Sequence, residues 1–179
     1  MELISGKEAA ERVHGILNAK FQVDGYSVHL TAGNIFSLDP LGKVDFSGSD
    51  YVPAGKTPIA TERRHPEDKY GWWELGRGSY IVEFNETLEL HGDELALVET
   101  LERLRRAGGS HATMSLRGRI APVEALLEVS ALRIEIKQNA RLSRLRLFRL
   151  NPTKIAPQPV HSLSEELLSA TGVPDFRKP

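Results

Sequence analysis

Cysteine is absent from this chain of 179 residues, which excludes disulfide bonds and metal sites built from thiolates. Long apolar runs are missing too, so we expect no segment that crosses a membrane. The first residues, MELISGKEAAERV, show no basic region followed by an apolar stretch, so we expect no signal peptide and a cytoplasmic protein. The net charge of −1 gives no overall attraction to nucleic acid or to a membrane, and we expect neither partner.

Motifs for metal and phosphate binding are equally scarce. The six histidines show no close spacing of the H-x-x-x-H kind, so we expect no metal site. Without cysteine, the chain also lacks the ligand pattern of the zinc-dependent deaminases. No Walker-type glycine loop, G-x-G-x-x-G or G-x-S-x-G motif occurs. These absences exclude several common classes of nucleotide-binding protein and hydrolase.

The chain has what a compact fold requires. Its hydrophobic content of 40% can form a core, and its length fits one domain at 1–160 with a C-terminal helix and tail at 161–179. Ser5 and Glu8 form a capping box, and the spacing of the apolar residues after it predicts an amphipathic helix over 6–19. A second capping box at Ser162–Glu165 predicts a short C-terminal helix that ends at Gly172.

Between these ends the pattern is typical of short strands. Glu99–Ala107 alone has helical periodicity, and Gly108 follows it as a stop signal. Residues 39–76 predict a long loop with short strands, and Gly33-Asn34 and Asn139-Ala140 predict turns. A mostly β barrel or sandwich follows. The predicted strands are Tyr26–Leu30, Ser79–Phe84, Glu94–Val98, His111–Leu116, Ala125–Val129, Leu132–Lys137 and Leu142–Leu150.

Three segments carry a resemblance to a known family. Ser27–Gly33 (SVHLTAG) resembles a strand written S/G-V-D-L-x-x-G, and Gly78–Val98 is similar to a strand-turn-strand that leads into a phosphate motif. Asn139–Leu150 (NARLSRLRLFRL) resembles a closing G-x-R-I-A-Q-L-x-F-F-R-L. In this order and spacing they resemble the dUTPase/dCTP deaminase superfamily. The resemblance implies a distorted β-barrel of the β-clip type, and a homotrimer with active sites between subunits.

The phosphate motif of that family, G-R-S-S-L-x-R-x-G, aligns with Thr100–Gly108, where Leu104, Arg106 and Gly108 match. Leu101 replaces the motif's first arginine, and Glu102 and Arg103 replace its two serines. Glu102 would repel a triphosphate, whereas Arg103 could hold one as a clamp. His29 stands where the family has an aspartate in its early strand.

The water-activating aspartate of dUTPases has no counterpart. Its segment corresponds to Ser115–Pro122 (SLRGRIAP), which contains no carboxylate, and arginine cannot accept a proton from water near neutral pH. The glycine-rich C-terminal arm of dUTPases is absent as well. In this segment Ser115 and Arg117 remain as candidate ligand-binding residues, together with Arg103 and Gly108 of the phosphate motif.

The dCTP deaminases instead use a glutamate on a strand and a serine and an arginine from the phosphate motif. Glu128 in LEVS corresponds to that glutamate and Arg106 to the arginine, which makes them the candidate catalytic residues. The serine is missing. Alternatively, Glu128 is an ordinary solvent-facing residue, since Leu127 and Val129 point to the opposite face of a strand.

Two functions stay open. The chain binds deoxypyrimidine nucleotides and hydrolyses dUTP or deaminates dCTP, with Mg2+ accompanying a bound triphosphate, or it is a catalytically inactive trimeric relative that acts as a structural or regulatory binding module. The dense arginines of residues 103–149 fit bidentate anion binding, but also a surface rich in ion pairs. Trp72-Trp73 could stack on a base or anchor the loop.

Overall fold

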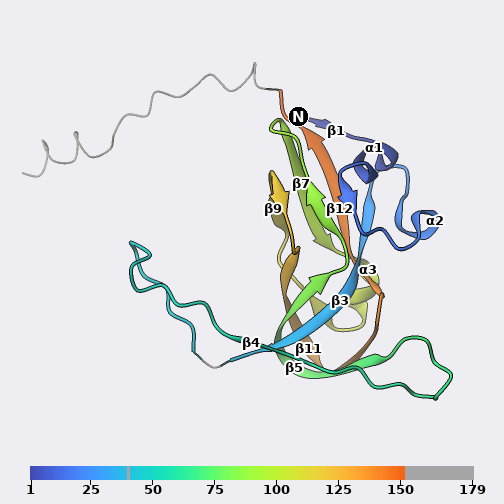
Figure 1. The fold of residues 1–179 in the computed structure, drawn as a ribbon, viewed down its shortest axis with the longest axis vertical. Helices are drawn as coiled ribbons and strands as arrows, with labels where there is room; N and C mark the ends of the chain where they lie inside the picture. The colour runs from blue at the N-terminus through green and yellow to red at the C-terminus, as the bar shows by residue number, and fades with distance from the viewer. Residues whose placement is uncertain (40, 152–179) are drawn as a thin grey trace, which may run out of the picture.

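The computed structural model describes residues 1–39 and 41–151 as a curled, mostly β body (Figure 1). The predicted C-terminal helix and the segment 161–179 lie outside the described residues. The larger sheet has nine strands, with β8-β11-β5-β3-β12-β7-β9 as neighbours in that order, β1 on β12 and β4 on β3. Its strands are β1 (Glu2–Leu3), β3 (Val28–Leu38), β4 (Lys56–Pro58), β5 (Trp72–Phe84), β7 (Glu94–Thr100), β8 (Gly109–Ser110), β9 (Met114–Leu116), β11 (Glu124–Lys137) and β12 (Arg141–Arg149).

A smaller sheet closes one side of the body. It pairs β10 (Arg119–Ile120), β6 (Thr87–Glu89) and β2 (Val13–His14) in that order. The three helices of the described residues are α1 (Gly6–Ala10), α2 (Ala19–Gln22) and α3 (Glu102–Arg106). None of them is long and apolar enough to cross a membrane. The predicted mostly β, barrel-like fold is thus confirmed.

The predicted N-terminal helix is much shorter than 6–19. Ser5 does cap α1, accepting a hydrogen bond from the amide of Glu8 at 3.3 Å. The helix ends at Ala10 because Val13 pairs with Leu88 in the small sheet, which buries its side chain there. Gly15 then takes a positive φ of 84°, which an α-helix cannot contain.

The long strands also differ from the predicted short ones. β3 continues through the predicted turn at Gly33-Asn34, where a register shift against β5 takes up the irregularity. The two strands predicted at 125–129 and 132–137 form the single strand β11, with a bulge between Val129 and Arg133. The predicted turn at Asn139 is confirmed by its φ of 63°. A bulge lets one continuous strand bend around the core. The bulge interrupts the alternation of apolar residues, so the sequence pattern predicts two strands.

The burial of β12 sets the two faces of the larger sheet. Leu145 and Leu147 are fully buried in the core, whereas Arg144 and Arg146 lie on the outer face. β12 pairs with β7 on one side and β3 on the other, so that Arg144 lies between Glu99 and His29. The outer face of these three strands is therefore the surface on which charged groups converge.

A long excursion leaves the body between β3 and β4. We call residues 41–55 the arm; Figure 1 shows it extending well away from the sheets. Lys43 and Val52 pair across it with backbone hydrogen bonds of 2.8 and 3.0 Å, and the amide of Asp39 donates to the carbonyl of Gly55 at its base. The predicted long loop thus contains an ordered, projecting hairpin.

Candidate functional site beside helix α3

Helix α3 occupies the position of the predicted phosphate motif. Leu101 and Leu104 are buried, which fixes this single turn against the core. Leu101, the residue that caps the helix, has no side-chain oxygen to accept from the free amides at the helix start. The turn instead presents Arg103, Arg105 and Arg106, all exposed.

Cationic side chains gather between α3, β12 and β3. Arg103 and Arg141 line one groove, and Arg141 donates to the carbonyl of Phe21. Nη1 of Arg141 lies 3.3 Å from Nδ1 of His29, and Arg144 is the cross-strand partner of His29. The charges of Arg103, Arg141 and Arg144 all act on His29, and we call these four residues the arginine cluster.

The pKa shifts in the arginine cluster report its excess of positive charge. Burial lowers the pKa of His29, and the nearby charge of Arg141 lowers it further, outweighing the opposing influence of Asp24 at 3.4 Å. Burial also lowers the pKa of Arg141, as does the charge of Arg103. His29 is therefore neutral at pH 7, and a bound anion would relieve the repulsion among the guanidinium groups.

An open cleft of about 320 Å3 lies on the other side of α3. Arg105, Arg144 and Arg146 reach it from α3 and β12, and Glu99 and Glu102 bring negative charge. Its remaining lining residues are Thr100, Ser110, His111 and Thr113. The cleft and the arginine cluster share Arg144, so a ligand in the cleft would contact the cluster directly.

His111 forms the floor of the cleft, a role that the sequence analysis did not foresee. Its Nε2 lies 2.7 Å from Oγ of Ser143, and its Nδ1 lies 2.8 Å from the carbonyl of Ala112. Oγ1 of Thr100 bonds both the amide and the carbonyl of His111, at 2.9 and 3.0 Å. Burial lowers the pKa of His111, which favours a neutral ring that donates from Nδ1 and accepts at Nε2. This network ties His111, which directly follows β8, to β7 and β12 beneath the cleft.

The residues predicted from the phosphate motif separate into different roles. Arg103 belongs to the arginine cluster. Arg106 points away into solvent and pairs with Glu102 at 2.7 Å. Gly108 has a φ of 91°, and its carbonyl accepts from the amide of Ser130 at 2.8 Å in the β11 bulge. The described contacts give Gly108 a conformational role, and its ligand-binding role stays a prediction.

Glu128 lies on the outer face of β11, as the alternation with Leu127 and Val129 predicted. Its two carboxylate oxygens accept from Oγ of Ser79 at 2.9 and 2.8 Å, and its cross-strand partner on the other side is Ser110. Because Ser110 also lines the cleft, Glu128 lies next to the cleft on the β8 side. The row Ser79–Glu128–Ser110 is thus a polar site accessible to solvent.

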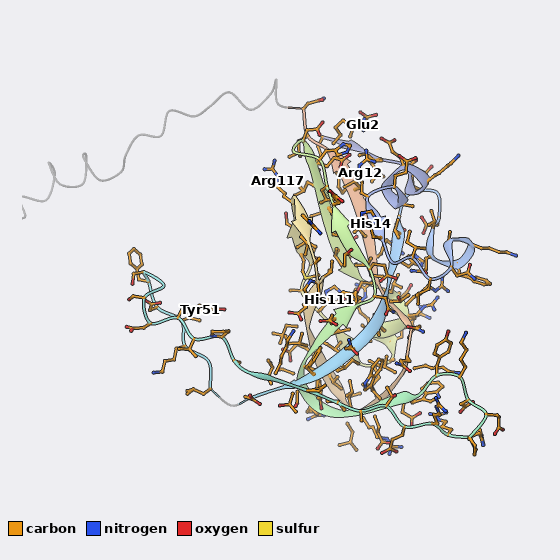
Figure 2. The ribbon with its side chains drawn as sticks, in the orientation of Figure 1. Glu2, Arg12, His14, Tyr51, His111 and Arg117 are labelled. Carbon is orange, nitrogen blue, oxygen red and sulfur yellow. The ribbon has the colours of Figure 1, made fainter. Side chains whose placement is uncertain are left out.

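Ser115 lies on β9 and Arg117 directly follows that strand, away from α3. Ser115 is exposed and pairs with Leu97 in the middle of β7. Arg117 donates to the carbonyl of Gly92 at 2.7 Å, which ties it to the turn before β7 rather than to its α3 end. Figure 2 shows Arg117 well apart from His111. One chain therefore does not bring these two predicted ligand-binding residues together with Arg103.

The arginine cluster does not fit a magnesium site of the protein's own. Mg2+ binds carboxylate and phosphate oxygens, but His29 stands in the early strand where the resemblance implies an aspartate, and its neighbours are guanidinium groups. In the cleft, Glu99 pairs with Arg146 at 3.2 Å and Glu102 with Arg106. Within residues 1–39 and 41–151, no three histidine, aspartate or glutamate side chains gather as a metal site.

Comparisons with known proteins agree with the motifs. A probable deoxyuridine 5'-triphosphate nucleotidohydrolase of Methanosarcina acetivorans is 27% identical over 162 residues, covering 84% of this chain and 90% of the relative. A probable enzyme of the same description from Methanosarcina mazei is 29% identical over 140 residues, covering 75% and 77%. No family model matches the chain.

A solved structure shares the fold. The 2'-deoxycytidine 5'-triphosphate deaminase of Agrobacterium tumefaciens superposes with a TM-score of 0.60 at 15% sequence identity, over 84% of this chain. This chain spans about half the length of that one, 48%. The sequence relatives and the shared fold support the superfamily that the three sequence motifs predicted.

Proposed function

We propose that this divergent member of the dUTPase/dCTP deaminase superfamily binds the phosphate groups of a deoxypyrimidine nucleotide between α3 and β12. The observation that carries the proposal is a division among the arginines. Arg106, Arg133, Arg146 and Arg149 each form an ion pair with a carboxylate. Arg103, Arg141 and Arg144 of the arginine cluster form none with the described residues, nor does Arg105 of the adjoining cleft. Arg117 and Arg119 form none there either, but they follow β9 and line neither the groove nor the cleft.

Phosphate is the ligand whose chemistry best matches such a cluster. Guanidinium groups bind phosphate oxygens with paired, charge-assisted hydrogen bonds. Nε of Arg144 is buried and has no hydrogen-bond partner among the described residues, so a ligand oxygen would satisfy it. Arg103 would replace the hydroxyl of the family's serine with a full positive charge, offsetting the unfavourable charge of Glu102.

Binding can be tested by isothermal titration calorimetry with dUTP, dCTP and dUMP, each with and without magnesium. We expect the triphosphates to bind more tightly than the monophosphate, because more phosphate oxygens meet the cluster. The double variant Arg103→Ala/Arg144→Ala should weaken triphosphate binding at least tenfold. Arg133→Ala, which removes an exposed arginine paired with Glu74, is the matched control and should leave binding unchanged. Equal losses in both variants would reject the proposed site.

Turnover is a second candidate, favoured by the exposed carboxylate of Glu128 beside the cleft. In it Glu128 positions or activates water for hydrolysis of dUTP or deamination of dCTP. We propose that the chain assembles as a homotrimer whose neighbouring copies complete the site. The water step of dUTPases is not part of this proposal, because Ser115–Pro122 offers no carboxylate as a base. The inactive binding module is the remaining alternative.

Product analysis separates these alternatives. Incubation with dUTP and dCTP under magnesium should release dUMP or dUTP if the chain is an enzyme, and Glu128→Gln should abolish that release while nucleotide binding persists. Binding without any product would identify the inactive module. Light scattering tests the homotrimer independently, because a mass near the 19.9 kDa of one chain would reject it.

A further inference from the structure

The arm exposes apolar side chains to a degree that a folded surface seldom tolerates. Phe46 at its tip is fully exposed, and Val44 is 90% exposed. Leu41, Tyr51 and Val52 are exposed as well. Figure 2 shows Tyr51 on this projection, away from the sheets. Exposed apolar side chains concentrated on one projecting segment typically mark a binding surface.

The arm is also ordered and acidic at its tip. Oδ2 of Asp45 accepts from Oγ of Ser47 at 2.8 Å and lies 3.3 Å from Oγ of Ser49, which shapes the loop between the paired Lys43 and Val52. Residues 44–51 (VDFSGSDY) carry two aspartates and no basic residue. The tip therefore combines two aromatic rings with net negative charge.

A groove that carries positively charged side chains lies on the outer side of β12. This groove of about 580 Å3 is lined by the apolar side chains of Leu3, Tyr26 and Phe148 and by Arg144 and Arg146. Leu3 is 41% and Tyr26 69% exposed. Asp24, Gly25 and Ser27 complete the lining. The groove thus offers apolar contacts beside two guanidinium groups and one carboxylate, an excess of positive charge that complements the acidic arm tip.

We infer that the arm of one copy of this chain docks into this groove of a second copy. Phe46 and Tyr51 pack against Leu3, Tyr26 and Phe148, while the acidic tip faces Arg144 and Arg146. The arm does not reach its own groove, because Figure 1 shows it leaving the body near β4 while β1 lies at the opposite end. The inference deepens the proposed homotrimer and rests on it for the second copy.

Docking would couple assembly to the proposed nucleotide site. Arg144 and Arg146 line both the groove and the cleft beside α3. The arm of the neighbouring copy would contact these two side chains from the groove and leave the cleft open for a nucleotide. A site shaped in this way is complete only in the assembled protein.

The absence of cysteine makes a direct test possible. Phe46→Cys and Tyr26→Cys are introduced into separate copies, which are mixed under conditions of subunit exchange and treated with a short bis-maleimide. We expect covalent dimers from the mixture and far fewer from either variant alone. Leu132→Cys, an equally exposed position on the β11 bulge, replaces Tyr26→Cys as the matched control and should give none.

A second measurement tests the docking of the arm without relying on a crosslink. Phe46→Ala/Tyr51→Ala should raise the dissociation constant of the assembly at least tenfold in sedimentation experiments, with an unchanged circular dichroism spectrum. An assembly that forms normally in this variant, or a crosslink no stronger than that of Leu132→Cys, would overturn the docking inference and leave the homotrimer intact. A chain that is monomeric at every concentration would overturn both, whatever its affinity for nucleotide.

Discussion

Removing Arg12 should destabilise the protein far more than removing any exposed arginine. Nε of Arg12 lies 3.2 and 3.1 Å from the two carboxylate oxygens of Glu94, whose side chain has no exposed surface. Breaking a buried pair leaves a charge without compensation, which costs about 3–5 kcal/mol. The amide of His91 still donates to Glu94 at 2.8 Å, so we expect about 3 kcal/mol for Arg12→Ala, at the low end of that range. For a domain of this size the melting temperature should fall by about 6–12 °C.

The pH dependence of the loss provides a second check. Burial raises the pKa of Glu94, but the His91 amide and Arg12 outweigh it, and the net pKa lies below the ordinary 4.5. The native pair therefore stabilises the fold above about pH 4.5, and this contribution disappears as the pH falls through the lowered pKa. The difference in unfolding free energy between wild type and Arg12→Ala should therefore become smaller as the pH falls.

Urea unfolding at pH 7 and pH 4 measures both effects. Arg106→Ala is the matched control, because its pair with Glu102 has side chains 80% and 65% exposed and should contribute little. A loss for Arg12→Ala no larger than that of Arg106→Ala, or one independent of pH, would refute the reasoning.

Three further predictions concern the site. Gly108→Ala should cost more than 2 kcal/mol in urea unfolding, because a positive φ and an overlap with the Cβ of Ala131 both oppose the methyl group; a neutral result would contradict the close packing of this turn. Ser143→Ala should cost about 1–3 kcal/mol, since it leaves Nε2 of the buried His111 without a partner, and calorimetric unfolding would show the fall in melting temperature. Glu128→Gln should leave stability nearly unchanged, because the side chain is exposed; a large fall in melting temperature would point to a structural role instead of a site for chemistry.

Much of the fold could be predicted from alternation along the chain. The strands predicted at Glu94–Val98 and Leu142–Leu150 are confirmed because their apolar positions are those that enter the core. The prediction of an N-terminal helix over 6–19 was wrong beyond Ala10, because an apolar residue there is buried in a sheet and not on a helix face. Val13 lies at helical spacing from Ala9, yet its side chain is buried by pairing with Leu88, a partner 75 residues away that local periodicity cannot reveal.

The site could be predicted only in part. The order of motifs indicated Arg103, and the spacing of Glu102 and Arg106 is that of a helical ion pair, which the structure contains. The pairing of Arg144 with His29 depends on strand register, which no local pattern fixes. His111 had no signal at all, because its partners Thr100 and Ser143 lie 11 and 32 residues away.

The pairing of β1 with β12 bears on how the protein comes to fold. Glu2 is the register partner of Arg149, so the first strand of the larger sheet needs a neighbour that is synthesised almost last among the described residues. Most contacts among the described residues join positions distant in sequence, and such contacts cost loop-closure entropy before they stabilise the fold. We therefore expect slow folding that begins only when β12 has left the ribosome, and a nascent chain whose N-terminal segment stays open until then.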